Sequence, residues 1–427
     1  MTQQLPHNDP SCEAEGSAGT QSGRSYLRPL LGALLLIGLV TFYYVLTWDS
    51  VDEFVIAIDH CEKLFCDFTN HYYPMGRSLF WDKTPVPGYF YTPFFALTLV
   101  PFGRLPLDTS LWLWGALQAL LLIVLIAAPA RLFLRRSPIS FYLYVFLVAT
   151  SLPVLHNLKW GQVSILMTAG ALLSLTLHRK GHPVAAAVML ALATWIKYYT
   201  GLLLVVFVIK RQYKFLIAFL AAGLLLGLIL PLGALGVRDG VRFYLDVNHA
   251  MAEADAWVPL DINSQHFPHV VWRLAGGESA EINVRPITLL GYLIAAVNLF
   301  LVYALMRANL PEWESWAYLL LFASLPFLLS TSWPHYFVYL PFCYALLAGQ
   351  LLTKTPRTWW RTAIEAALLV GSVVLSSAFL FNALGDRFTY SGLGLLFFSN
   401  LLVLASAYLA LGPQLLDNLP PKRQPSA

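Results

Sequence analysis

The apolar run PVAAAVMLALATWIKYYTGLLLVVFVI, residues 183–209, contains one charged residue, Lys197. A helix rises about 1.5 Å per residue, so one straight helix of this length would exceed the roughly 30 Å hydrocarbon core of a bilayer. The polar segment KYYTG, residues 197–201, lies in its middle, where an ammonium group at membrane depth is costly. We therefore predict two short helices that break near 197–201, so that the chain returns to the side from which it came.

Apolar runs recur along the whole chain. They fall near 27–47, 89–103, 108–130, 139–158, 161–178, 183–209, 214–235, 287–306, 314–332, 335–352, 363–382 and 391–412. Only 12% of the residues are charged and 58% are hydrophobic, with a mean hydropathy of +0.63. Soluble domains carry about twice this share of charge. The sequence predicts an all-α polytopic membrane protein with about 11–12 transmembrane helices.

Basic segments indicate which loops are cytoplasmic. They are Arg24 with Arg28, RLFLRRS at 131–137, HRKGH at 178–182, KRQYK at 210–214, Arg307, KTPRTWWR at 354–361 and PPKR at 420–423. All can face the cytoplasm if residues 89–103, which are short and rich in proline, do not cross separately. Both termini are then cytoplasmic.

This topology divides the chain into a membrane domain and two tails. Residues 1–25 are polar and are expected to form a disordered cytoplasmic tail. Residues 26–413 form the transmembrane domain, and residues 414–427 a second cytoplasmic tail. Within the domain, residues 48–88 and 236–286 are two long extracytoplasmic loops. A strong internal repeat is missing, which disfavours an inverted-repeat transporter.

Composition also bears on partners and on redox chemistry. The net charge of +4 is small and dispersed, so we expect no nucleic-acid partner. The four cysteines form no metal-type cluster with histidines. Cys61 and Cys66 form either a disulfide, if their side is oxidising, or two free thiols. No acidic cluster of metal-ligand type accompanies Asp67, and we expect neither a metal ion nor another cofactor.

Polar residues gather in the turns predicted to be extracytoplasmic. Asp67 and His71 lie in the first loop, HNLKWGQ at 156–162 in a turn, DINSQHFPHVVWRL at 261–274 in the second loop, and TSWPHY at 331–336 in another turn. Each has a simpler explanation: Lys197 can extend to the interface, Asp67 can be solvated or cap a helix, and NSQ at 263–265 can be a turn. Their common side favours one polar cavity.

The order of these motifs resembles glycosyltransferase family 87. The resemblance spans roughly residues 30–410. The segments that carry it are DFTNHYYPMGRSLF at 67–80, YTPFFALTLVPFGRLPL at 91–107, GQVSILMTAGALLSL at 161–175, the segment 181–214, NSQHFPHVVWRL at 263–274 and SWPHYFVYLP at 332–341. Lys197 falls on the family's lysine. The sequence departs from the family at Thr92, where the family has proline, at Thr200 and Gly201, where a proline is missing, and at Ser264 and Gln265, which are exchanged.

The resemblance implies a GT-C-like fold and an inverting membrane glycosyltransferase. The enzyme would move a mannose- or pentose-like sugar from a polyprenyl phosphate donor to a lipid or glycan acceptor. It would be a multi-pass protein of the plasma (inner) membrane with an extracytoplasmic active site. Asp67, in the first loop, would be the catalytic base.

The resemblance and the polar turns together nominate the remaining site residues. Lys197, Arg273 and His335 are candidates for the donor phosphate, with Lys159 behind them. Tyr72, Tyr91 and Trp333 are candidates for packing on sugars or isoprenes, and His71 for positioning. Gln162, Asn263 and Gln265 are candidates for sugar hydroxyls. Three alternatives stay open: a transporter or flippase of lipid-linked sugars, an oligosaccharide polymerase or ligase, and a structural membrane protein.

Overall fold

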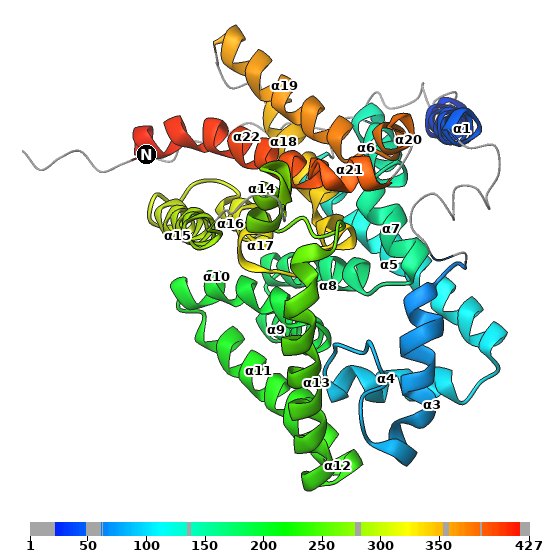
Figure 1. Ribbon diagram of the computed structural model, residues 1–427. Coiled ribbons are helices and arrows are strands. Elements are labelled where there is room, and N and C mark those ends of the chain that lie inside the picture. The colour runs from blue at the N-terminus through cyan, green and yellow to red at the C-terminus, as the bar shows by residue number, and fades with distance from the viewer. Residues whose placement is uncertain are drawn as a thin grey trace, which may run out of the picture.

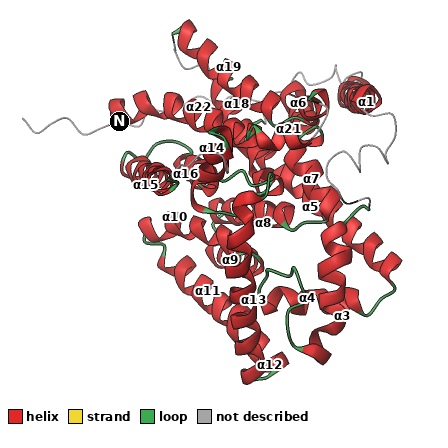
Figure 2. Cartoon of the chain, in the orientation of Figure 1, coloured by secondary structure: helices red, strands yellow, loops and turns green. Residues whose placement is uncertain are grey.

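The computed structural model describes residues 22–47, 61, 63–134, 138–277, 283–352, 358–384 and 387–418. These residues form helices and loops without a strand (Figures 1 and 2), apart from an isolated bridge between Ser151 and Ser377. The helices are α1 (Ser22–Thr47), η1 (Phe68–Tyr72), α3 (Tyr73–Asp82), α4 (Pro93–Gly103), α5 (Leu107–Phe133), α6 (Pro138–Ala149), α7 (Leu152–Trp160), α8 (Ser164–Arg179), α9 (Pro183–Ile196), η2 (Tyr198–Leu203), α10 (Leu204–Ile209), α11 (Tyr213–Leu224), η3 (Leu225–Ile229), α12 (Leu230–Leu235), α13 (Val237–Trp257), η4 (Val258–Leu260), α14 (Phe267–Leu274), α15 (Arg285–Arg307), α16 (Trp313–Ala323), α17 (Leu325–Leu328), η6 (Pro334–Tyr339), α18 (Leu340–Leu351), α19 (Trp359–Leu375), α20 (Ala378–Ala383), α21 (Arg387–Gly392) and α22 (Leu395–Asn418).

The predicted break at Lys197 is confirmed. Helix α9 ends there because the Lys197 backbone is extended, with φ −144° and ψ 118°. The chain continues as the short helices η2 and α10, and α9 packs between α8 and α11 (Figure 1). The polar segment therefore interrupts the apolar run, as the cost of burying its groups in one continuous helix predicts.

Membrane-spanning helices are present, as predicted. Within the described residues, four segments are long and apolar enough to cross a bilayer alone: α5, α15, the continuous segment Tyr213–Leu235, and Leu395–Leu416 of α22. A fifth candidate is the pair α7 and α8, which bend by 119° at the break between them. Several other predicted crossings are built from shorter helices, so the count of 11–12 stays a prediction. Helix α4 is also short, in keeping with the expectation that residues 89–103 do not cross separately.

Burial follows the pattern of a helical membrane protein. All residues of α16 are buried, and α18 is buried over most of its length. The outer helices instead expose large apolar side chains, such as Ile123 on α5, Leu220 on α11 and Phe300 on α15. A soluble protein seldom exposes apolar faces of this extent, whereas lipid covers them at no cost. The fold is therefore an all-α polytopic membrane protein.

The basic segments at 178–182 and 210–214 meet at one end of α8 and α10. Glu314, at the start of α16, lies 2.5 Å from Lys210 Nζ, 3.4 Å from His178 Nε2 and 3.5 Å from Arg179 Nε. Helix α8 runs from this cluster to Ser164 at its other end, beside Gln162. The two ends of α8 thus carry different chemistry: a compensated basic cluster, and the turn that holds Gln162.

Residues 237–257 form the long helix α13, which the hydropathy pattern did not reveal because the segment mixes charged and apolar residues. It follows α12 directly, packs against it and also contacts α4. Lys83, just after α3, donates to Asp239 of α13 at 2.8 Å and so ties the first predicted loop to the second. The predicted boundaries at 48, 414 and 427 fall partly on residues outside the described ranges and stay predictions.

Candidate functional site

Segments far apart in the chain enclose a cavity of about 760 Å³. Most of the residues predicted from the sequence line it. These are Asp67, His71, Tyr72, Tyr91, Gln162, Lys197, Asn263, Trp333 and His335. The common polar cavity inferred from the sequence therefore exists.

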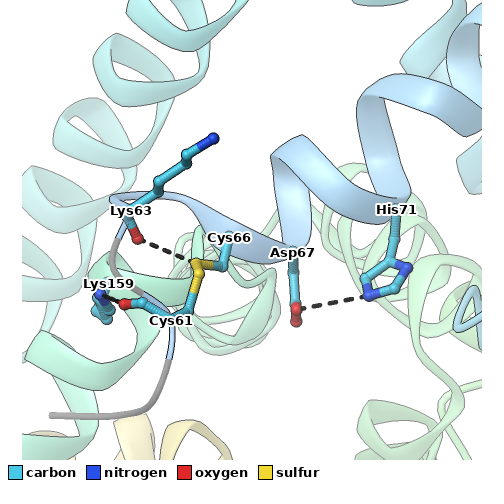
Figure 3. The surroundings of a disulfide bond; sticks show 6 residues. All are labelled: Cys61, Lys63, Cys66, Asp67, His71 and Lys159. Carbon is cyan, nitrogen blue, oxygen red and sulfur yellow. Dashed lines mark hydrogen bonds and ion pairs between the residues drawn. A yellow bond between two sulfur atoms is a disulfide. The ribbon is translucent and has the colours of Figure 1, made fainter. Parts of the chain in front are cut away.

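Asp67 is held at the start of η1 by a short covalent loop (Figure 3). Cys61 and Cys66 form a disulfide with a Cα–Cα distance of 6.5 Å, which resolves the alternative left open by the sequence. The buried Lys159 donates to the Cys61 carbonyl oxygen, and Phe65 N–H donates to the Lys159 carbonyl oxygen at 2.7 Å. Lys159 thus anchors this loop and does not line the cavity.

Gln162 fixes the orientation of the Asp67 carboxylate. Its Nε2 donates to Asp67 Oδ2, and its Oε1 accepts from Tyr91 OH at 2.8 Å, with Tyr72 OH 3.0 Å away. The two hydroxyls lie 2.6 Å apart. A carboxylate only accepts, so the amide nitrogen must face Asp67 and the amide oxygen the tyrosines. Gln162, a candidate for binding sugar hydroxyls, is engaged with protein groups at both ends of its amide.

The sharp turn between α7 and α8 brings Gln162 to this position. Gly161 has φ +66°, and a Cβ there would lie 3.0 Å from Phe65 Cβ. Its carbonyl oxygen accepts from Trp114 Nε1 at 2.9 Å, which fixes the turn against α5. Only glycine combines this left-handed backbone with such a close approach.

His71 faces the other oxygen of Asp67. Its Nε2 lies 4.0 Å from Asp67 Oδ1 (Figure 3). Its Nδ1 lies 2.9 Å from the Pro87 carbonyl oxygen. A carbonyl only accepts, so Nδ1 carries the proton and Nε2 of the neutral ring is an acceptor. Burial lowers the pKa of His71, although the Pro87 bond opposes this shift. The ring is therefore neutral at pH 7.

The Lys197 ammonium lies between two aromatic rings. Its Nζ is 4.0 Å from the Tyr336 ring centroid and 5.2 Å from that of Tyr91, and the residue is 7% exposed. No ion pair to Lys197 occurs in the described part of the chain. A buried cation that has cation–π contacts and only the longer-range attraction of Asp67 is poorly compensated, so the cavity favours an anion beside it.

Thr92 explains one departure from the family pattern. Its side chain accepts from Phe95 N–H at the start of α4 and donates to the Trp195 carbonyl oxygen near the end of α9. A proline at this position could make neither side-chain bond. Thr92 therefore ties α4 to the helix end that carries Lys197.

His335 is the second candidate for the donor phosphate that lines the cavity. It is 3% exposed, and its ring stacks on His156 with centroids 5.5 Å apart. Neither ring nitrogen has a hydrogen-bond partner among the described residues. Buried ring nitrogens are normally paired, so a ligand in the cavity is the natural partner.

Two predicted residues lie behind the cavity wall. Arg273 donates to the backbone carbonyl oxygens of Ser264 at 2.6 Å, Ser391 at 3.3 Å and Asp261 at 3.4 Å. Gln265 is fully buried and donates to the Ser391 carbonyl oxygen at 3.1 Å. Neither residue lines the cavity. Both hold the segment 261–265 against α21 and α22, and this segment presents Asn263 to the cavity.

Sequence reasoning missed several cavity residues. They are His156, Trp160, Trp257, Asp261 and Tyr336. Four of them lie inside the quoted segments HNLKWGQ, DINSQHFPHVVWRL and TSWPHY, but their side chains were not singled out. Trp257 gave no signal, because nothing in the sequence places the end of α13 over the cavity.

The segment behind Asn263 contains one buried and one half-buried histidine, His266 and His269, which predict a pH-dependent stability. Burial lowers the pKa of His266 to about 4 and that of His269, which also lies near His266 and Arg273, to about 3. The unfolded chain binds these protons near pH 6.5, so the unfolded state holds more protons below that pH and stability falls as the solution is acidified. We expect the midpoint of thermal unfolding of the purified protein to drop between pH 7.5 and pH 4.5.

The matched variant for this prediction is His269→Gln. Its unfolding midpoint should depend less steeply on pH than that of the wild type. An equal slope in both proteins would show that other groups cause the acid sensitivity.

The described residues contain no group of three or more His, Cys, Asp or Glu side chains arranged to hold a metal ion. The cavity instead combines one carboxylate held by an amide, one buried ammonium and two stacked imidazoles. Such a set suits a ligand that has hydroxyl groups and an anionic group.

Comparison with known proteins agrees with this chemistry. The sequence matches the family model for glycosyltransferase family 87 over residues 89–332, which is more than half of the chain. No curated protein and no solved structure matches. Lys197, Gln162 and Asn263 lie inside the matched range, whereas Asp67 precedes it and His335 follows it.

Proposed function

Because the chain belongs to glycosyltransferase family 87, and is therefore a membrane glycosyltransferase, we propose that it transfers a sugar from a polyprenyl phosphate donor to a lipid or glycan acceptor with inversion at the anomeric carbon. One observation carries the proposal: a carboxylate, Asp67, and a buried lysine without an ion-pair partner among the described residues, Lys197, line the same cavity. Tyr91 links them, because it donates to the amide that holds Asp67 and lies under the ammonium.

Asp67 is the base in this mechanism. The acceptor hydroxyl oxygen attacks the anomeric carbon and transfers its proton to Asp67 as the new bond forms. The bond between the anomeric carbon and the phosphate oxygen breaks, and its electron pair leaves with the polyprenyl phosphate. In its ionised form a carboxylate only accepts hydrogen bonds, so it can take this proton.

Gln162 is a positioning residue in this scheme. Its amide donates to Asp67 Oδ2 and so fixes the orientation of the carboxylate toward the acceptor hydroxyl. His71 lies beside Oδ1 as a neutral ring, and its unprotonated Nε2 can accept from a second sugar hydroxyl. A base held in one orientation needs little reorganisation when the proton arrives.

The leaving phosphate needs positive charge and hydrogen-bond donors as the bond breaks. Lys197 supplies the charge, and His335 supplies a ring N–H from a nitrogen that has no protein partner in the described residues. Arg273 is less suited to this role than the sequence implied, because backbone carbonyl oxygens occupy its guanidinium.

Two observations support an extracytoplasmic cavity. The Cys61–Cys66 disulfide adjoins Asp67, and disulfides persist in oxidising compartments. The basic segments around Arg179 and Lys210 cluster at the other end of α8, and basic loops are enriched on the cytoplasmic side.

This topology predicts a labelling pattern. After the native cysteines are replaced, single cysteines at Asn70 and Asn248 should react with a membrane-impermeant maleimide added to intact cells, because both residues lie on the proposed outer segments. A cysteine at Lys180 should react only after the membrane is permeabilised. Labelling of positions 70 and 248 from opposite sides would contradict a shared extracytoplasmic site.

The activity itself is tested with membranes that contain the protein and a panel of radiolabelled polyprenyl-phosphate sugars. Label that moves to a lipid or glycan product identifies a transferase and its donor together. Label that crosses the membrane while still attached to the polyprenyl phosphate would instead identify a flippase.

A further inference from the structure

Asp261 is a second carboxylate on the cavity, at the end of the helical segment α13–η4. Its Oδ2 accepts from Trp333 Nε1 at 2.6 Å, and its Oδ1 accepts from Asn263 N–H at 2.9 Å. Each carboxylate oxygen keeps further lone pairs for a ligand. Arg273 donates to the backbone oxygen of Asp261 and attracts the carboxylate only from beyond ion-pair distance. The carboxylate is therefore fixed in orientation without an ion-pair partner among the described residues.

Two tryptophans flank this carboxylate. The rings of Trp257 and Trp333 are nearly parallel, with planes 22° apart and centroids 6.5 Å apart. Both line the cavity, and Trp257 is 47% exposed. Leu260, also on the cavity, is 59% exposed, so this part of the wall lies at the opening. An indole face attracts the C–H groups of a sugar ring through its negative quadrupole, while the ring's hydroxyls remain free for polar contacts.

We propose that Asp261, Trp257 and Trp333 form a subsite for a sugar ring of the acceptor, so that the acceptor is a carbohydrate. A fixed carboxylate accepts hydrogen bonds from sugar hydroxyls and repels a phosphate, so this subsite does not suit the charged end of the donor. Its position at the opening suits a ligand that extends into solvent. That the bound sugar is the acceptor rests on the proposed function. The binding of a sugar at Asp261 does not depend on it.

The binding test uses the purified full-length protein and a mixture of methyl glycosides of mannose, glucose, galactose and arabinofuranose. Saturation-transfer difference NMR should detect at least one of them with the wild type. The signal should fall several-fold in Asp261→Asn and in Trp257→Ala. Trp257→Ala keeps the hydrogen bonds of Asp261. The Trp257 ring is half-exposed, so its removal does not open the core. Asp246→Asn and Trp81→Leu are the matched controls, because both residues are surface residues away from the cavity, and they should keep the wild-type signal.

The kinetic test separates this subsite from the base and from the donor site. Loss of one hydrogen bond to a charged group should raise the acceptor KM about tenfold in Asp261→Asn, with kcat and the donor KM nearly unchanged. A rise in the donor KM alone, with a normal acceptor KM, would overturn the inference and leave the transferase intact.

The two proposals fail in different ways. A wild type that binds a glycoside through Trp257 but transfers nothing from any polyprenyl phosphate donor would refute the proposed function and keep the subsite. A wild type that transfers sugar while no glycoside gives a Trp257-dependent signal would refute the subsite alone.

Discussion

We expect the Asp67→Asn variant to fold, to bind its donor and to transfer almost no sugar. Asparagine keeps the size of the side chain but cannot take the proton of the acceptor hydroxyl. Removal of a general base slows a reaction by a factor of about 10²–10⁴, so kcat should decrease by a factor of this size. The measurement is single-turnover transfer from a polyprenyl-phosphate sugar by purified protein.

Two controls make the Asp67 result interpretable. Thermal unfolding should show a folded protein, because the residue borders the cavity and its neighbours stay in place. The Asp246→Asn variant removes a surface carboxylate from α13 and should transfer at the wild-type rate. Near-normal transfer by folded Asp67→Asn would mean that the base lies elsewhere. The unprotonated Nε2 of His71, which lies beside Asp67 on the cavity, would be the alternative.

The second large effect is expected at Lys197. Methionine is of similar length, so Lys197→Met keeps the packing against Tyr91 and Tyr336 and removes only the charge. A charge-assisted contact to phosphate contributes about 1.5–3 kcal/mol, which corresponds to a loss of roughly tenfold to a hundredfold in kcat/KM for the donor. The loss should appear with full-length and with short-chain polyprenyl donors, because the missing contact is to the phosphate.

Stability distinguishes binding from a merely structural role of Lys197. Replacing a poorly compensated buried cation by an apolar side chain leaves a protein as stable or makes it more stable. The variant should therefore unfold at the same or a higher temperature while it loses donor use. The exposed Lys180→Ala variant is the control and should behave as wild type. Equal activity of all three proteins would indicate that Lys197 only extends toward the membrane interface.

The sequence predicts the fold class and the break at Lys197 because both depend on hydropathy along the chain. It could not predict that Leu152–Trp160 and Ser164–Arg179 bend by 119°, since this turn depends on contacts of Gly161 with Phe65 and Trp114, which are distant in sequence. Helix α13 could not be predicted from the sequence for a related reason. Its residues are neither apolar enough for a span nor polar enough for a loop, and its position depends on partners such as Lys83.

The candidate site was predictable to the level of motifs. The topology predicted from the sequence put Asp67, Lys197 and His335 on one side of the membrane, where segments can approach one another. All three residues line the same cavity. Side-chain direction could not be read in the same way. Arg273 and Gln265 belong to a motif at the cavity, yet their side chains point to backbone groups of their own supporting loop. Asp261, the first residue of the quoted segment 261–274, does reach the cavity.

The cavity also bears on how the chain assembles. Tyr72 and Gln162 are 90 residues apart in sequence, Asp261 and Trp333 are 72 apart, and Asn263 and Ser391 are 128 apart. Contacts of this separation form late, because a long intervening segment must be ordered first. Helices inserted early during synthesis are individually stable in lipid, but they meet the last cavity residues only when α17 and η6 have been made. A growing chain thus carries Asp67 and Lys197 before His335 and Tyr336 exist, and the proposed active site is complete only after η6 has been made.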